Sequence, residues 1–415
     1  MYRYTYKNMA RVLLFTCLLI NTAMAEQASA DTTLNMQWLL QQVRKHPDLI
    51  AARERRIGQM FLADGLQKPI YNPNLDTEYE KEGSDRNYSV GISQTFDRNN
   101  KRQSRSLKAD SLRISAKQQY ELALQEKVSQ ALRTYNEWQA ISKAAQLAIE
   151  QEAQLAHLLE IIKNRQSYGD LGQLDAELAY LSLSQGYGRS ANIIAKKRKI
   201  ESQLTELLPD WNKQTIELSI FSDSDLDAMN SQQNIDRHPQ VMAAKAKWQM
   251  LQADTEIARK QKKADPSFGI NVGKVANDNL LSLSFSMPLN LRNNFSAQYK
   301  AAIQAESAAQ SNYLAIRRKQ QLLIDASAAA LNAYRLRHEK WQTLMQGRDK
   351  NSENLLQKQW NIGDISTTEY LLTLQQRTES LLAGIDLEKE YQAAIIQLLT
   401  DTAQLGINPT SEKNK

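Results

Sequence analysis

Residues 281–289 read Leu281-Ser282-Leu283-Ser284-Phe285-Ser286-Met287-Pro288-Leu289. Large apolar residues alternate with small residues throughout this stretch, and a period of two places them on opposite faces of a strand. A second alternating run, 268–273, precedes it, and the turn-forming residues 276–279 separate the two runs. The sequence therefore predicts a β-hairpin over about 266–290, with one apolar face and one polar face.

A similar hairpin is predicted in the first half of the chain, over about 73–97. Leu75, Thr77 and Tyr79 share one face of its first run, and Tyr88, Val90, Ile92 and Phe96 share one face of its second. Strand segments of about ten residues with this alternation are typical of transmembrane barrels, although a soluble hairpin packed on helices would show the same local pattern. Four strands are too few to close a barrel. They must therefore either pack on helices or join strands from other chains.

Four short motifs occur twice in the chain, in the same order and 192 to 194 positions apart. The pairs are His46-Pro47 with His238-Pro239, Asn72-Pro73-Asn74 with Asp265-Pro266-Ser267, Arg98-Asn99-Asn100 with Arg292-Asn293-Asn294, and Gly169-Asp170-Leu171 with Gly363-Asp364-Ile365. This period is too long for a solenoid repeat and indicates a duplication. We assign the copies to 26–208 and 235–407, joined by a connecting segment, 209–234, and followed by a polar tail, 408–415.

Each hairpin precedes a segment with the composition of a long helix. Residues 102–168 contain neither Gly nor Pro, and a helix of that length would span about 100 Å. The counterpart, 295–362, is interrupted only by Gly347. A glycine follows each segment and can cap it in the left-handed conformation, so we expect return helices to about 208 and 405. Another helix is predicted over 35–68.

The first 25 residues predict a secretory signal peptide. Basic residues precede a short apolar run, 12–20, and Ala23-Met24-Ala25 forms a cleavage site. The only cysteine, Cys17, lies inside this signal; lipidation there is the alternative, but Phe15-Thr16 before it is a poor match to a lipoprotein signal. Three of the 52 basic residues leave with the signal, so the net charge falls from +6 to +3 and indicates no nucleic-acid binding.

Motifs for enzymatic chemistry are absent from the sequence. It has no phosphate-binding loop, no nucleophile elbow, no H-E-x-x-H and no paired-cysteine motif. The four histidines are far apart, and His46 and His238 each precede a proline at a predicted helix boundary, which favours a cap over a metal ligand. We expect no enzymatic activity, no metal site and no cofactor.

Two carboxylates occupy equivalent positions, because Asp175 and Glu369 each lie six residues after a repeated glycine. One interpretation is a solvated acid in the first turn of a helix, where negative charge is favourable. The other applies if several chains assemble symmetrically, since such acids would then form rings that select cations.

Together these features resemble the TolC-type outer-membrane efflux proteins, over essentially the whole mature chain. The segments 46–49, 72–75 and 94–102 resemble most the CzcC-like branch, which serves heavy-metal pumps of the resistance–nodulation–division type. The resemblance implies a mainly α fold with a β-barrel portion, in which a homotrimer closes one twelve-stranded transmembrane β-barrel and an α-barrel extends into the periplasm. It places the chain in the outer membrane of a Gram-negative bacterium, in contact with lipid.

The resemblance also implies partners and roles. The chain would be the exit duct of a tripartite system for divalent heavy-metal cations, with a periplasmic membrane-fusion adaptor and an inner-membrane proton-driven pump. The adaptor would contact the helix tips, Gly169-Asp170-Leu171 and Gly363-Asp364-Ile365, while Asp175, Glu369 and Trp360 would lie at the periplasmic entrance or gate. Trp360 stands where a well-known relative has a gating tyrosine, and Leu372 stands where it has a second acid.

Two alternatives remain open from the sequence. The duct could carry organic drugs or a secreted polypeptide instead of metal cations. A soluble periplasmic coiled-coil adaptor or scaffold would also explain the signal peptide and the long helices, but not the alternation in 281–289. A secreted enzyme is disfavoured because no convergent polar site is apparent.

Overall fold

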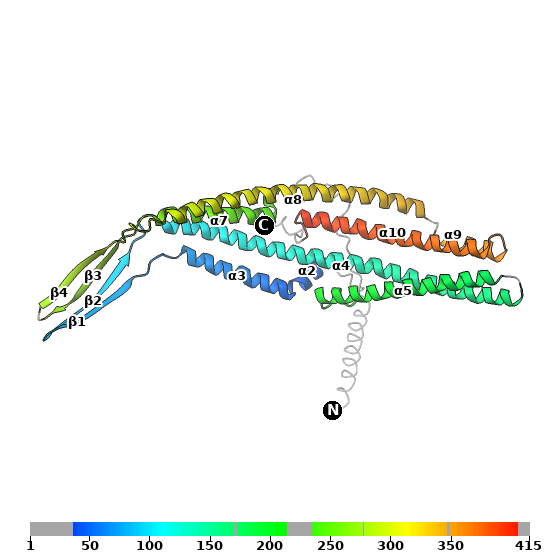
Figure 1. The fold of residues 1–415 in the computed structure, drawn as a ribbon, viewed down its shortest axis with the longest axis horizontal. Helices are drawn as coiled ribbons and strands as arrows, with labels where there is room; N and C mark the ends of the chain where they lie inside the picture. Colours follow the sequence, from blue (N-terminus) through cyan, green and yellow to red (C-terminus); the bar gives the residue numbers. More distant parts are fainter. Residues whose placement is uncertain (1–35, 170–171, 214–234, 277, 347–348, 406–415) are drawn as a thin grey trace, which may run out of the picture.

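The computed structural model describes residues 36–169, 172–213, 235–276, 278–346 and 349–405. The predicted signal peptide with Cys17, most of the connecting segment, the polar tail, Asp170 and Leu171 lie outside the described residues. The molecule is elongated, with a β-sheet at one end and two helical turns at the other (Figure 1). Among the described residues no helix is both long enough and apolar enough to cross a membrane.

The order of elements repeats along the chain. The first copy contains α3 (Pro47–Gln67), β1 (Asn74–Glu82), β2 (Asp85–Thr95), α4 (Lys101–Ser167) and α5 (Gln173–Leu207). The second contains α7 (Pro239–Gln261), β3 (Ser267–Val275), β4 (Asp278–Ser286), α8 (Ser296–Met345), α9 (Asp349–Asn361) and α10 (Thr367–Asp401). A short helix, α2 (Met36–Arg44), precedes the first copy, and a 3-10 turn, η1 (Ile235–Arg237), precedes the second.

Two of the expected helices are broken, which corrects the sequence prediction. The helix expected over 35–68 is divided into α2 and α3 at His46, whose backbone is extended (ψ 136°). Pro47 can begin a helix but cannot continue one, because it lacks an amide hydrogen. The helix expected over 295–362 is divided into α8 and α9. α8 ends at Met345, because the next residue, Gln346, has a ψ of 119° outside the helical range.

The four strands form one antiparallel sheet in the order β1-β2-β3-β4. Its register aligns Leu75 with Ile92, Ile92 with Ile270, and Ile270 with Leu283. Because directly paired residues point to the same side of a sheet, these four side chains form one apolar row across it. The sheet therefore unites the hairpins of both copies.

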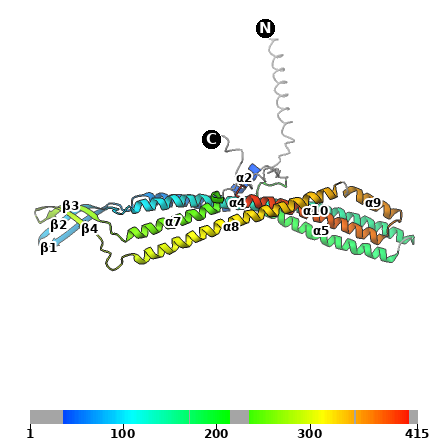
Figure 2. The same ribbon diagram turned by 90° about the horizontal axis from the view of Figure 1, so that it is seen from above.

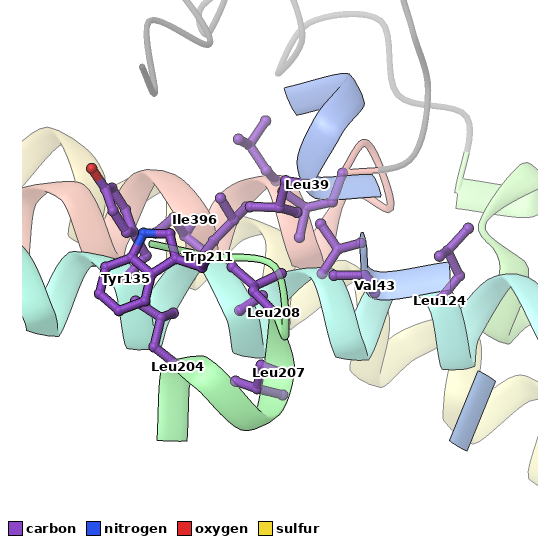
Figure 3. Close-up of a cluster of buried hydrophobic side chains, with 14 of the residues drawn as sticks. Leu39, Val43, Leu124, Tyr135, Leu204, Leu207, Leu208, Trp211 and Ile396 are labelled. Carbon is purple, nitrogen blue, oxygen red and sulfur yellow. The ribbon is translucent and has the colours of Figure 1, made fainter. Parts of the chain in front are cut away.

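Two bundled layers of helices extend from the sheet. α3 and α5 lie end to end along α4, and α7 and α10 lie along α8, which Figure 2 shows from a second direction. The main core lies where α2, the end of α5 and the end of α10 meet the middle of α4. Leu39, Val43, Tyr135, Leu204 and Trp211 are among its buried side chains (Figure 3). Burial of such side chains contributes about 1.5–3 kcal/mol each and fixes the return helices against α4.

Candidate functional site

The two helical turns opposite the sheet depend on glycine. Gly169 and Gly363 have φ values of +78° and +82°, which side chains with a Cβ adopt only under strain. At the second turn the Gly363 amide donates to the Trp360 carbonyl (3.2 Å), and the Asp364 amide donates to the Gln359 carbonyl (2.9 Å). This pair of bonds is the Schellman motif, which ends a helix and reverses the chain.

Asp175 and Glu369 lie in the first turn of the return helices α5 and α10. The Glu369 carboxylate accepts from the Ser366 amide (2.9 Å), and the Ser366 hydroxyl accepts from the Glu369 amide (3.1 Å). This capping box holds the pKa of Glu369 below its usual value, mainly through the Ser366 amide. The equivalent cap of α5 is Gly172, which has no side chain, so Asp175 lacks that constraint.

Trp360 is buried rather than open to solvent, with 3% of its surface exposed. Its indole nitrogen donates to the Thr367 hydroxyl (3.3 Å), and its ring stacks on Tyr370 with 5.3 Å between centroids. The Arg165 guanidinium from the end of α4 lies 4.7 Å from the centre of the Trp360 ring. Trp360 therefore connects the tip of one copy to the tip of the other.

We call the apolar cluster beneath these residues the tip core. It contains Leu155, Leu158, Leu159 and Ile162 from α4, Ala176, Ala179 and Leu183 from α5, Trp360 from α9, and Leu371 and Leu374 from α10. Ile365 packs partly buried against it, whereas Leu372 is exposed. No sequence pattern singles out Arg165, because basic residues are common near helix C-termini.

At the other end, the apolar face of the sheet is open. Leu75, Ile92, Ile270 and Leu283 are 57–80% exposed, and the next row, Thr77, Val90, Val272 and Leu281, lies on the same face. Small or polar residues occupy most of the opposite face, as in the row of Asn74, Ser93, Gly269 and Ser284; Val275 and Leu280, near the β3–β4 turn, are the exceptions. The alternation predicted from the sequence is therefore a property of the whole sheet, and none of the described helices covers its apolar side (Figures 1 and 2).

A buried polar cluster joins the sheet to the helices. The Asp265 carboxylate accepts from the Lys101 ammonium (2.7 Å), the Tyr71 hydroxyl (2.7 Å) and the Asn99 amide (3.2 Å). Burial would raise the pKa of Asp265, but the Lys101 and Tyr71 donors outweigh it and hold the pKa below its usual value. Burial and the neighbouring carboxylate raise the pKa of Tyr71 to about 12.

His46 and His238 are helix caps, as the sequence predicts. The Nδ1 atom of His46 accepts from the Asp48 amide, and that of His238 accepts from the Gln240 amide, each at 3.2 Å. Within the described ranges, no three His, Cys, Asp or Glu side chains are grouped so that they could hold a metal ion.

Sequence and structure comparisons give different results. No protein-family model matches the sequence, and no curated protein matches it. Solved structures do match: the CmeC outer membrane channel of Campylobacter jejuni has a TM-score of 0.73 and 15% identity over 92% of this chain and 90% of that one. The outer membrane protein VceC of Vibrio cholerae has a TM-score of 0.73 and 13% identity, covering 89% and 96%. The transmembrane channel protein CusC has a TM-score of 0.71 and 15% identity, covering 88% and 91%.

The sequence identities are low, but each alignment covers nearly all of this chain and nearly all of the matched chain. The chain therefore has the mainly helical fold, with a small sheet, of the TolC-type outer-membrane channels.

Proposed function

We propose that this chain is one protomer of an outer-membrane exit duct, assembled as a homotrimer. The observation that carries the proposal is the sheet, whose apolar face is open and whose opposite face is small or polar except at Val275 and Leu280 near the β3–β4 turn. Lipid would cover the first face, and the second would line a water-filled path. The similarity to solved outer-membrane channels supports the same assignment.

The strand number supports a trimer. β1 and β4 are the edges of the sheet, and open edges are a liability that closure removes. Three copies of a four-stranded sheet would close one twelve-stranded barrel. The helices would then form an α-barrel in the periplasm, with the turns at Gly169 and Gly363 farthest from the membrane.

We further propose that the duct exports divalent heavy-metal cations, together with a periplasmic adaptor and an inner-membrane proton-driven pump. The resemblance of segments 46–49, 72–75 and 94–102 to CzcC-like proteins supports this cargo. The chain would act as a passive path and would catalyse no reaction, since the pump would select and energise the substrate. Organic drugs or a polypeptide are the alternative cargo.

Membrane fractionation and conductance test the duct. The full-length protein should sediment with outer membranes, require detergent for extraction, migrate as a trimer and conduct ions in planar bilayers. Deletion of its gene should lower tolerance to zinc, cobalt or cadmium salts. A soluble, non-conducting protein would overturn the duct and favour the periplasmic scaffold. Lowered drug tolerance with unchanged metal tolerance would leave the duct proposal in place and would change the assigned cargo from metal cations to organic drugs.

The two first-turn acids provide a test of the entrance. In a trimer Asp175 and Glu369 would contribute six carboxylates near the tips, which should favour cations. We expect the double variant Asp175→Asn/Glu369→Gln to lower the cation-to-anion permeability ratio, measured from reversal potentials in a salt gradient. Glu177→Gln, which removes a neighbouring exposed acid on α5, is the control. If the double variant and the Glu177→Gln control had equal permeability ratios, the proposal that Asp175 and Glu369 line the entrance would be wrong.

A further inference from the structure

The charged residues of the sheet are sorted by face. Register places six carboxylates on the polar face, namely Asp76, Glu78, Glu80, Glu82, Asp85 and Asp278. The three basic residues of the described strands, Lys81, Arg86 and Lys274, all lie on the apolar face. Lys81, Arg86 and Lys274 are exposed. On that face the described strands supply no carboxylate to pair with them.

On the apolar face, the rows of side chains change in character from the helices toward the hairpin turns, and the three cations lie near the turns. Nearest the helices, Phe96, Phe268 and Phe285 pack together, with ring centroids 5.9 and 5.2 Å apart. Two rows follow that are aliphatic except for Thr77. Beyond them Tyr79 pairs with Tyr88, and Tyr88 pairs with Lys274. Lys81 pairs with Arg86 in the last row of this face before the turn.

This order matches the layers of a membrane. Phe268 and Lys274 are six residues apart, so about 20 Å of strand separates them, comparable with the ~25 Å apolar band that barrels present to lipid. Aromatic rows at both ends correspond to the two interfaces. Lys and Arg extend their charged ends past the apolar layer, into the region where lipid phosphates lie.

We propose that Lys81, Arg86 and Lys274 form a binding surface for the phosphate groups of anionic lipids, in the leaflet at the hairpin-turn end of the sheet. The Arg86 guanidinium can bind a phosphate through two parallel hydrogen bonds, and the lysines add point charges. The absence of carboxylates from the same face of the described strands leaves this positive charge unneutralised. In a trimer the surface would recur three times around the barrel. The inference rests on the proposed membrane placement.

The test uses the full-length channel in nanodiscs of phosphatidylcholine, with diphosphoryl lipid A as the probe. Native mass spectrometry counts lipid A molecules retained per channel across a titration. Wild type should retain lipid A in preference to phosphatidylcholine, and added salt should weaken the preference. Each cation lost should lower apparent affinity about fivefold, so Lys81→Gln/Arg86→Gln/Lys274→Gln should lose the preference. Asp76→Asn/Glu78→Gln/Glu80→Gln, on the opposite face of the same sheet, should keep it.

The outcomes separate this inference from the duct itself. If the triple basic variant retains lipid A as wild type does, or if wild type shows no preference, the lipid-phosphate surface is wrong. Conductance and trimer migration are measured on the same preparations. A non-conducting wild type that still binds lipid A would overturn the duct alone. A triple variant that conducts normally but has lost lipid A would support both proposals and exclude misfolding as the cause.

Discussion

The Asp265 carboxylate lies 2.7 Å from the Lys101 ammonium, although 164 positions separate them in the chain. Only 2% of the Asp265 side chain and 11% of the Lys101 side chain are exposed. Asp265 precedes β3 and Lys101 begins α4, so the pair fastens the second hairpin to the first long helix. In the duplicated motifs Asn72 corresponds to Asp265, and Phe295 corresponds to Lys101. Neither Asn72 nor Phe295 is charged, so the ion pair cannot form a second time.

We expect Lys101→Met to destabilise the folded protein strongly. It would leave a buried carboxylate without its partner, which typically costs about 3–5 kcal/mol. The matched control is Lys108→Met, which breaks the more exposed pair with Asp254 and should cost about 1 kcal/mol or less. Thermal unfolding of the detergent-solubilised proteins measures both. Similar losses in the two variants would contradict a special role for the Lys101–Asp265 pair, and Lys101→Met/Asp265→Leu should recover much of the loss.

His238 should make stability depend on pH. Burial lowers its pKa to about 4, and the nearby Asp401 carbonyl opposes the shift without forming a well-aligned hydrogen bond to Nε2. Between about pH 6.5 and pH 4, His238 is therefore protonated in the unfolded chain but remains neutral in the folded chain. The free energy of unfolding should fall as the pH is lowered through this window, by up to about 3 kcal/mol.

The control for this pH effect is His238→Asn. Asparagine is a good N-cap residue but does not titrate, so the variant should lose that part of the pH dependence while keeping helix α7. Unfolding curves at several pH values, compared as differences between wild type and variant, isolate the contribution of this one group. A difference that stays constant from pH 7 to pH 4 would contradict it.

Local patterns predicted much of the fold because they involve residues close in sequence. Period-two alternation determined the two faces of each hairpin, and register made them continuous across the sheet. The proline after His46 and the glycines at 169 and 363 marked helix ends through backbone restrictions alone. The single helix predicted over 35–68 was nevertheless wrong, because the prediction gave the helix-forming composition on both sides of Pro47 more weight than the proline itself.

Pairings between distant residues could not be predicted in this way. Lys101 and Asp265 each look like ordinary surface charges until the sheet brings their segments together. The resemblance to TolC-type proteins implied that Trp360 lies near a tip, but its burial under Arg165 depends on how two helical hairpins pack. The expected roles of Asp175, Glu369 and Trp360 at an entrance stay predictions, because they concern an assembly of several chains.

Gly384 provides a test of helix packing. A Cβ atom built there would lie 1.9 Å from the Trp341 ring, whereas one at Gly188 would meet nothing within 4 Å. We expect Gly384→Ala to separate α10 from α8 and to destabilise the protein by about 1–3 kcal/mol. Gly188→Ala should instead stabilise it by up to about 1 kcal/mol, because alanine favours the helix. Unfolding midpoints that shift in the same direction would contradict the close packing on Trp341.

Arg165 and Trp360 should restrain opening of the helical tips. Their contact joins α4 of the first copy to α9 of the second, and a cation over an indole ring contributes about 0.5–2 kcal/mol. If opening the duct separates these tips, Arg165→Gln should raise the open probability severalfold in planar bilayers. Lys163→Gln is the matched control, because Lys163 lies 5.1 Å from the Tyr180 ring, a contact between two helices of the first copy. Lys163→Gln should therefore leave gating unchanged. If both variants open equally often, the Arg165–Trp360 contact does not hold the tips together, and the restraint must lie in the apolar packing of the tip core.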